Sequence, residues 1–168
     1  MAERTNVEMV TLRNADILRG SWRNFAGQKG PYNDEGKRSF HVRLPDDVAR
    51  EMERDGFNIK ELRARDEDEE PGFRVEIAVS YKIRPPQVFL ISGGVRTLLD
   101  EGSVEILDYV DIAKADLIIQ PSFWEVNGKT GLKAYLHKLY VTARTDELDE
   151  EYASIPLGHS QSAEIPEF

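Results

Sequence analysis

The side chains best suited to chemistry in this chain are aromatic and basic residues that are interleaved within three segments. The first segment runs from Arg19 to Arg43, the second from Tyr81 to Arg84, and the third from Lys129 to Tyr140. Single-stranded nucleic acid requires this combination. Cationic groups follow its phosphates, and aromatic rings stack on its unpaired bases, with each stacked base worth roughly 1–3 kcal/mol. The three segments therefore predict a nucleic-acid-binding surface.

The candidate contact residues divide into cations for phosphates and rings for bases. The predicted phosphate contacts are Arg19, Arg23, Lys29, Lys37, Arg38, Arg43, Lys82, Arg84, Lys133 and Lys138. The predicted stacking residues are Trp22, Phe25, Tyr32, Phe40, Tyr135 and Trp124. Core packing is the competing interpretation for Phe40 and Tyr135, because both alternate with apolar neighbours. Trp124 precedes a turn and fits either a stacking platform or a core anchor.

Motifs for catalysis, cofactors or metals are scarce. Gly128–Thr130 resembles the end of a phosphate-binding loop, but Phe123 stands where that loop needs a glycine. The three histidines, His41, His137 and His159, are never at metal-ligand spacing, and the chain has no cysteine. We therefore expect a protein that is not an enzyme and that needs no cofactor or metal.

Charge is distributed unevenly along the chain, whose formal net charge is −9. Six basic and two acidic residues lie between Arg19 and Arg43, whereas seven acidic residues and no lysine or arginine follow from Asp146 onward. This asymmetry predicts an electrostatic partner for each part, and the acidic end can also cover the basic surface and compete with DNA.

Several absences bear on where the protein acts. No apolar run approaches the roughly 20 residues of a membrane helix, and Met1–Val10 lacks the apolar centre of a signal peptide. The lack of cysteine fits a reducing compartment. These features predict a cytoplasmic protein that has no contact with a membrane.

Hydrophobic alternation predicts a chain made mostly of strands. The expected strands are Val7–Leu18, Arg38–Leu44, Phe73–Ile83, Gln87–Ser92, Asp116–Val126 and Leu132–Ala143. Asn127-Gly128 predicts a tight hairpin between the last two, and Pro121 an edge or a bulge. Gly93-Gly94 predicts a turn, and Ser21–Gly36 a long loop.

Helical signals are confined to two places. Asp46–Asp55 is expected to form a helix with Asp46 as its N-cap and Gly56 at its end, and Ser103–Tyr109 one or two helical turns. The elements together favour a mainly β fold: a small antiparallel barrel of five to six strands with one inserted helix. A β-sandwich is the competing architecture. Residues 1–145 would form the binding domain, and residues 146–168 a largely disordered acidic tail.

Several short motifs carry a family resemblance across the predicted domain. They are Asn24-Phe25-x-Gly27, Gly36-Lys37-Arg38-Ser39-Phe40-x-Val42, Gly56-Phe57-Asn58, Pro85-Pro86, Phe123-Trp124-Glu125-Val126-Asn127-Gly128 and Ala134-Tyr135-Leu136. This pattern resembles phage-type single-stranded DNA-binding proteins related to the oligonucleotide-binding (OB) barrel. The resemblance implies a five-stranded barrel with a helix after an early strand. It also implies sequence-nonspecific binding of single-stranded DNA during replication, recombination or repair in the host cytoplasm.

The last four residues, Ile165, Pro166, Glu167 and Phe168, carry a second resemblance. They are similar to the acidic tip of bacterial single-stranded DNA-binding proteins, which ends in Ile-Pro-Phe, although Glu167 interrupts that pattern here. Phage-type relatives have short acidic tails that end in Phe. The resemblance implies that the tail recruits replication or recombination proteins.

Two other classes of function stay open at this stage. An acidic DNA mimic would use the −9 charge to occupy a DNA-binding protein, and a virion assembly protein would use its aromatic residues to pack subunits. The basic cluster between Arg19 and Arg43 argues against the mimic. The sequence leaves open the choice between DNA and RNA and the formation of a homodimer.

Overall fold

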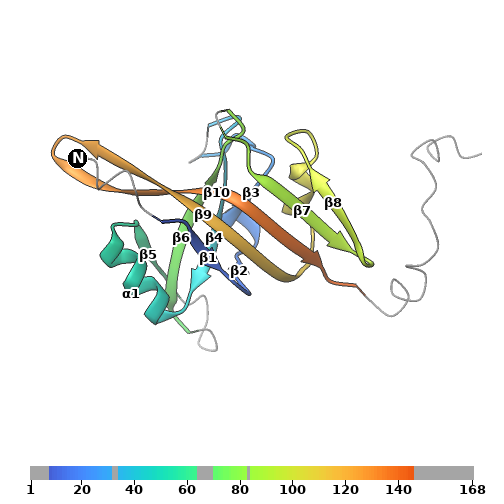
Figure 1. Cartoon of the computed structure of the whole chain (residues 1–168), viewed down its shortest axis with the longest axis horizontal. Coiled ribbons are helices and arrows are strands. Elements are labelled where there is room, and N and C mark those ends of the chain that lie inside the picture. The colour runs from blue at the N-terminus through green and yellow to red at the C-terminus, as the bar shows by residue number, and fades with distance from the viewer. Residues whose placement is uncertain (1–7, 32–33, 64–69, 83, 146–168) are drawn as a thin grey trace, which may run out of the picture.

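The computed structural model describes residues 8–31, 34–63, 70–82 and 84–145, and these form a mainly β fold with one α-helix (Figure 1). The strands are β1 (Val10–Leu12), β2 (Asp16–Ile17), β3 (Arg23–Asn24), β4 (Arg38–Leu44), β5 (Ile59–Leu62), β6 (Gly72–Val79), β7 (Gln87–Ser92), β8 (Val95–Leu99), β9 (Ile112–Val126) and β10 (Lys129–Ala143). The helices are α1 (Asp46–Asp55) and two 3₁₀ helices, η2 (Gly20–Trp22) and η3 (Val104–Asp108).

A long antiparallel hairpin of β9 and β10 runs through the centre of the sheet, and its tip extends beyond the rest of the fold (Figure 1). Asn127 and Gly128 connect the two strands with φ values of 51° and 80°. Positive φ at both positions is the conformation that tight hairpin turns require, and Asn-Gly adopts it readily. The predicted hairpin is therefore confirmed. β1 pairs with β9 only from Leu117 to Ile119. Pro121 lies beyond that pairing, at an edge of the sheet, as predicted.

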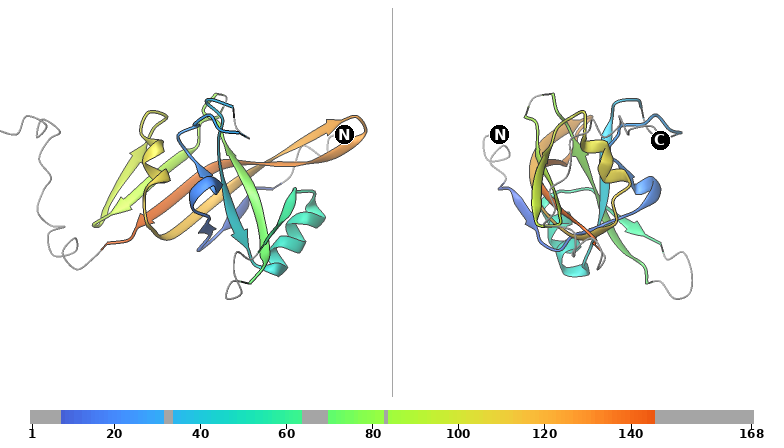
Figure 2. Two further views of the ribbon diagram at one scale, coloured as in Figure 1. Left: turned by 180° about the vertical axis from the view of Figure 1, so that it is seen from behind. Right: turned by 90° about the vertical axis from the view of Figure 1, so that its right-hand side faces the viewer.

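The sheet curls round a core because one N-terminal segment supplies the strands at both of its ends (Figure 2). The strand path runs β1-β9-β10-β6-β4-β2, yet β1 and β2 are consecutive along the chain. Between them, the amide of Ala15 donates to the carbonyl of Ala115 at 2.7 Å, and the amide of Asn14 donates to Asp116 Oδ1 at 2.9 Å. The segment therefore links β9 to β4.

One edge of β10 has two partners in succession, and both run parallel to it. β6 pairs with β10 at Ala134 and Tyr135, and β7 pairs with it from Lys138 to Thr142. A register shift in the pairing with β9 falls between Leu136 and Lys138. β6 and β7 therefore meet the edge of β10 on opposite sides of this shift.

The helix α1 follows β4 directly and has the predicted bounds. Its N-cap position is Pro45, with no side-chain hydrogen bond, so the prediction of Asp46 as N-cap was wrong. Asp46 instead lies in the first turn, where its charge suits the positive end of the helix dipole. Gly56 ends the helix at φ 113°, and its amide donates to Glu53 and Met52.

The prediction of a mainly β, mainly antiparallel fold is confirmed, but the strands differ from the prediction in number. The expected strand Val7–Leu18 is divided into β1 and β2, and Phe73–Ile83 ends at Val79. Neither β5 nor β8 was predicted, because only two of the four β5 residues are apolar and β8 is largely exposed. The described residues thus form ten strands rather than five to six, and two of the pairings are parallel. No helix among them is long and apolar enough to cross a membrane.

The core lies inside the curled sheet, and two phenylalanines stand near its centre. Phe25 and Phe40 are completely buried, and their rings stack with centroids 4.8 Å apart. Val42, Ile77 and Leu139 belong to the same cluster. Burial of an aromatic pair contributes both apolar area and ring–ring attraction.

Replacing Phe40 by Ala is expected to lower the free energy of unfolding by about 3–5 kcal/mol, because it leaves a cavity at the stacked pair. Urea unfolding followed by circular dichroism measures this change. Val95→Ala, at a position 60% exposed on β8, serves as the control and should change the free energy by only about 0.5 kcal/mol. A loss below about 1 kcal/mol for Phe40→Ala would contradict this description of the core.

Candidate nucleic-acid interface

Strands β4 and β6 place polar side chains on the outer face of the sheet through simple alternation. On β4, Phe40 and Val42 point into the core, so His41 between them points outward. The register pairs His41 with Glu76 on β6, which places Glu76 and Arg74 on the same outer face. The alternation of core and polar residues thus brings a histidine, an arginine and a glutamate together.

Trp22 joins this group from the short helix η2. The Arg74 guanidinium carbon lies 4.3 Å from the centroid of the Trp22 ring, and the ring meets His41 edge to face at 5.0 Å. Arg74 Nη1 lies 2.9 Å from His41 Nδ1, and His41 Nε2 lies 3.4 Å from Glu76 Oε2. Because arginine can only donate, His41 Nδ1 accepts and its Nε2–H points to the carboxylate.

Glu76 is held ionised by its neighbours. The hydrogen bond from His41 lowers the pKa of Glu76, and the charges of Lys37 and Lys60 lower it further, while burial opposes the shift. The carboxylate in turn fixes the orientation of the imidazole beneath Trp22. The four side chains therefore form a preorganised polar network on the sheet surface.

Trp124 lies on the same face, on the projecting part of the hairpin. Its register partner on β10 is Gly131, and a Cβ atom at that glycine would lie only 2.7 Å from Trp124 Cζ2. The indole therefore lies across the backbone of β10 at a point where any other residue would displace it. Trp124 is 39% exposed, so part of its ring is open to solvent.

A cleft of about 220 Å³ separates Trp124 from the network around Trp22. Its polar lining is His41, Asn58, Lys60, Arg74, Glu76 and Lys133, and its apolar lining includes Phe57, Leu132 and Trp124. Beside it on β10, Lys133 Nζ stands 5.1 Å from the ring centroid of Tyr135. We call Trp22, His41, Lys60, Arg74, Trp124, Lys133 and Tyr135 the basic aromatic face. It combines ring surfaces with cations, which is the pairing that single strands require.

Four of the predicted contact residues, Trp22, Trp124, Lys133 and Tyr135, lie on this face. Four others are exposed in two loops that meet at one end of β4 and β6: Lys29 and Lys37 precede β4, and Lys82 and Arg84 follow β6. Lys138 lies further along β10. Tyr32 and the tail residues Ile165, Pro166, Glu167 and Phe168 lie outside the described residues.

Three predicted contacts are core residues in the structure. Phe25 and Phe40 stack on each other with no exposed surface, so neither ring is open to a base. Arg23 is 8% exposed, and its guanidinium donates to the carbonyls of Ile17, Leu18, Leu107 and Val110. Burial, followed by the charge of Arg19, lowers the pKa of Arg23. These residues hold the fold together rather than offering a contact to DNA.

Three further arginines are engaged by groups away from the basic aromatic face. Arg19 pairs with Asp111 at 3.1 Å, and Arg38 pairs with Glu101 at 3.3 Å. Arg43 donates to the carbonyl oxygen of Glu70 at 2.8 Å. The structure therefore does not bring these side chains into the surface predicted for them.

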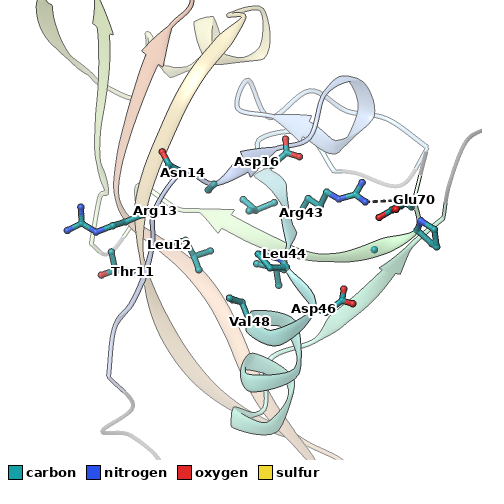
Figure 3. Close-up of a pocket in the computed structure, with 15 residues that line it drawn as sticks. Thr11, Leu12, Arg13, Asn14, Asp16, Arg43, Leu44, Asp46, Val48 and Glu70 are labelled. Carbon is teal, nitrogen blue, oxygen red and sulfur yellow. Dashed lines mark hydrogen bonds between the residues drawn. The ribbon is translucent and has the colours of Figure 1, made fainter. Parts of the chain in front are cut away.

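Arg43 instead borders a second, larger cleft of about 480 Å³ between the β1–β2 connection and the start of α1 (Figure 3). Its lining contains two arginines, Arg13 and Arg43, and three carboxylates, Asp16, Asp46 and Glu70. None of the described residues that line this cleft is aromatic. It therefore lacks the stacking surface that an unpaired base needs.

The sequence analysis missed His41, Lys60 and Arg74 as members of the interface. The alternation that buries Phe73 and Val75 already placed Arg74 on a polar face, but its aromatic partner Trp22 comes from a distant segment. The contact between Arg74 and Trp22 therefore could not be predicted from either sequence segment alone. Within the described residues, no group of three or more His, Cys, Asp or Glu side chains is arranged to hold a metal ion.

Comparison with solved structures defines the class of fold. The single-stranded DNA-binding protein from bacteriophage Enc34 in complex with ssDNA is 14% identical, with 82% of this chain and 88% of that chain covered at a TM-score of 0.55. A second structure of the Enc34 protein is 14% identical, with 94% of this chain and 89% of that chain covered at a TM-score of 0.53. At these identities the likeness concerns the fold, which is that of a phage single-stranded DNA-binding protein.

The family assignment rests on the sequence of the whole chain. The family described as "putative phage ssDNA-binding domain" matches residues 2–167. The chain therefore belongs to this family, as its motifs predicted. Curated proteins, in contrast, include no significant match to the chain.

Replacing Glu76 by Gln tests the polar network through its pH dependence. The folded-state pKa of Glu76 lies below the ordinary value of 4.5, so its stabilisation is complete above that pH and is lost as the pH falls through the folded pKa. The wild type should therefore be more stable than Glu76→Gln at about pH 7, and the difference should shrink at about pH 3. Urea unfolding at both pH values measures this.

The matched control for that experiment is Glu51→Gln, which removes an exposed carboxylate from α1. Its difference from the wild type should change much less between the two pH values. A Glu76→Gln difference that stays constant over the same range would contradict the network.

Proposed function

We propose that the protein binds single-stranded DNA without sequence preference through the basic aromatic face. It would protect and organise the single strands of a phage during replication, recombination or repair in the host cytoplasm, with no catalysis of its own. The observation that carries this proposal is the placement of both tryptophans of the chain on one sheet face, with Arg74, Lys60 and Lys133 around them.

The geometry suits bases and phosphates in different ways. Trp124 and Tyr135 present ring surface at the sheet, and an unpaired base of any identity has a π-face that can stack there. Lys60 and Lys133 are exposed cations beside the rings, positioned to follow a phosphate backbone. A duplex hides its base faces in its own stack, so this surface favours the single strand.

Family membership and a neighbour's ligand support the same function. The chain belongs to a family described as binding phage ssDNA, and a structural neighbour is described in complex with ssDNA. The cations of the face also argue against a DNA mimic, which needs a negative surface. A virion assembly role, in which aromatic residues pack subunits together, would not require cations beside the rings.

Because the chain has only two tryptophans, fluorescence can report each side of the face separately. Trp22→Phe leaves Trp124 as the reporter, and Trp124→Phe leaves Trp22. We expect an oligo-dT of about 30 nucleotides to quench both single-tryptophan proteins, with affinity falling as salt rises. Lys133→Ala should weaken binding and reduce the slope of log affinity against log salt by about 0.7.

The controls separate this face from general charge attraction. Arg50→Ala removes an exposed cation from α1 and should leave affinity and salt slope unchanged. A duplex of the same length should produce little quenching. Absence of quenching by the single strand, together with no mobility shift after removal of residues 154–168, would contradict the proposed function.

The acidic tail is proposed to regulate this surface and to recruit partners. Residues 146–168 carry seven acidic and no basic residues, so they can compete with DNA for the same cations at high local concentration. Their end, Ile165–Phe168, offers apolar groups and a carboxylate to replication or recombination proteins.

Deleting residues 154–168 should tighten binding of the oligo-dT at low salt, and the gain should disappear at high salt, where the competition is screened. Fluorescence titration at two salt concentrations measures the effect. A chain of full length with Glu164→Gln and Glu167→Gln should show a smaller gain in the same direction. Equal affinities for the full-length and shortened proteins would exclude competition by the tail.

A further inference from the structure

A second group of rings and a cation stands on the outer surface of β10, β7 and β8, away from the basic aromatic face. Tyr140 and Phe89 are register partners, and their rings stack with centroids 5.0 Å apart and 13° between planes. Arg96 of β8 places its guanidinium carbon 4.9 Å from the Phe89 centroid. Leu139 and Val88, adjacent along the two strands, are completely buried, so the group faces away from the core.

The stack of Tyr140, Phe89 and Arg96 ends at an exposed cation on one side and at a half-buried ring on the other. Phe89 covers the side of the Tyr140 ring that faces β7. On the other side, the register partner of Tyr140 is Asp116 of β9, whose carboxylate is engaged by Lys114 at 3.6 Å and by the amide of Asn14. At the opposite end, Arg96 is exposed. Bases stack on aromatic rings and on guanidinium planes alike.

The same strand connects this stack to the basic aromatic face. Tyr135 points outward, Leu136 and Leu139 are buried, and Lys138 and Tyr140 are half-buried on the outer side. The register shift between Leu136 and Lys138 adds one residue, so the outward side chains stay on one face along the whole strand. Their β9 partners, Gln120 and Asp116, are four residues apart, so Tyr135 and Tyr140 are about 13 Å apart along β10.

Positive charge lies between the two groups of rings. β6 pairs with β10 as far as Tyr135, and β7 pairs with it from Lys138, so the connection from β6 to β7 starts and ends next to the register shift. This connection contains Lys82 and Arg84 and no acidic residue, and both cations are exposed. Lys138 stands at the start of the pairing with β7. A phosphate backbone that follows β10 would meet these cations between one set of rings and the next.

We propose that Tyr140, Phe89 and Arg96 form a second stacking platform for single-stranded DNA, reached along the outer surface of β10 from the basic aromatic face. This inference rests on the proposed function and extends it, because none of the stack's contacts is needed for a short strand to bind. Leu98 beside Phe89 is 60% exposed and would also suit a protein surface. The surrounding cations and the continuity along β10 favour the nucleic acid.

The length of the bound strand separates the two platforms. Tyr140→Leu removes a ring face, and Arg96→Ala removes an exposed cation with little risk to folding. We expect Tyr140→Leu to weaken binding of an oligo-dT of about 30 nucleotides roughly 5- to 20-fold, and Arg96→Ala roughly 2- to 5-fold. Neither variant should change the affinity for an oligo-dT of about 4 nucleotides, which one platform can hold.

The outcomes distinguish this inference from the proposed function. If the wild type binds neither length, the proposed function fails, and this inference fails with it. If the wild type binds both lengths and the variants match it on the long strand, only the second platform is excluded. Equal losses of affinity for both oligonucleotide lengths would also overturn the second platform. A lower molecular mass of the variants in light scattering would overturn it as well. The last result would assign the stack to contact between copies of the chain. Arg50→Ala is the control throughout.

Discussion

Hydrogen bonding along both edges of β10 holds the core and the outer surface of the sheet in register. This strand of 15 residues pairs with β9 along its length and with β6 and β7 in succession along its other edge. Its inward residues, such as Leu136 and Leu139, fill the core, and its outward residues carry Lys133, Tyr135 and Tyr140. The inward side of β10 therefore contributes to stability, and its outward side carries candidate binding residues.

A second consequence of the pairing is preorganisation of the surface. The register between β4 and β6 sets His41 against Glu76, and Arg74 then bridges from the histidine to the Trp22 ring. Trp124 is fixed differently, because its ring lies on a glycine of the neighbouring strand. Side chains ordered before binding lose less conformational freedom when a ligand arrives, so this network lowers the entropic cost of association.

Local patterns predicted the elements that have strong local signals. Alternation predicted β4, apolar residues at helical spacing followed by Gly56 predicted α1, and Asn127-Gly128 predicted the hairpin. Sequence could not show that Phe25, in a polar loop-like stretch, is buried against Phe40, because that burial depends on η3 and the distant strands. It also could not join Arg74 to Trp22, since the contact exists only after β4 and β6 pair with the N-terminal segment. The motifs were enough to predict the family. Assigning each residue to the core or to the outer surface required the strand register of the structure.

The measurement that tests the central claim most directly is a nuclear magnetic resonance titration of the full-length protein with oligo-dT, following the backbone amides and the two indole N–H signals. Binding at the basic aromatic face predicts that both indole signals shift, together with the amides near Lys133 and Tyr135. The amides near Asn14 and Asp46, beside the cleft that lacks rings, should stay unchanged. Shifts confined to that cleft, with both indoles unmoved, would contradict the account.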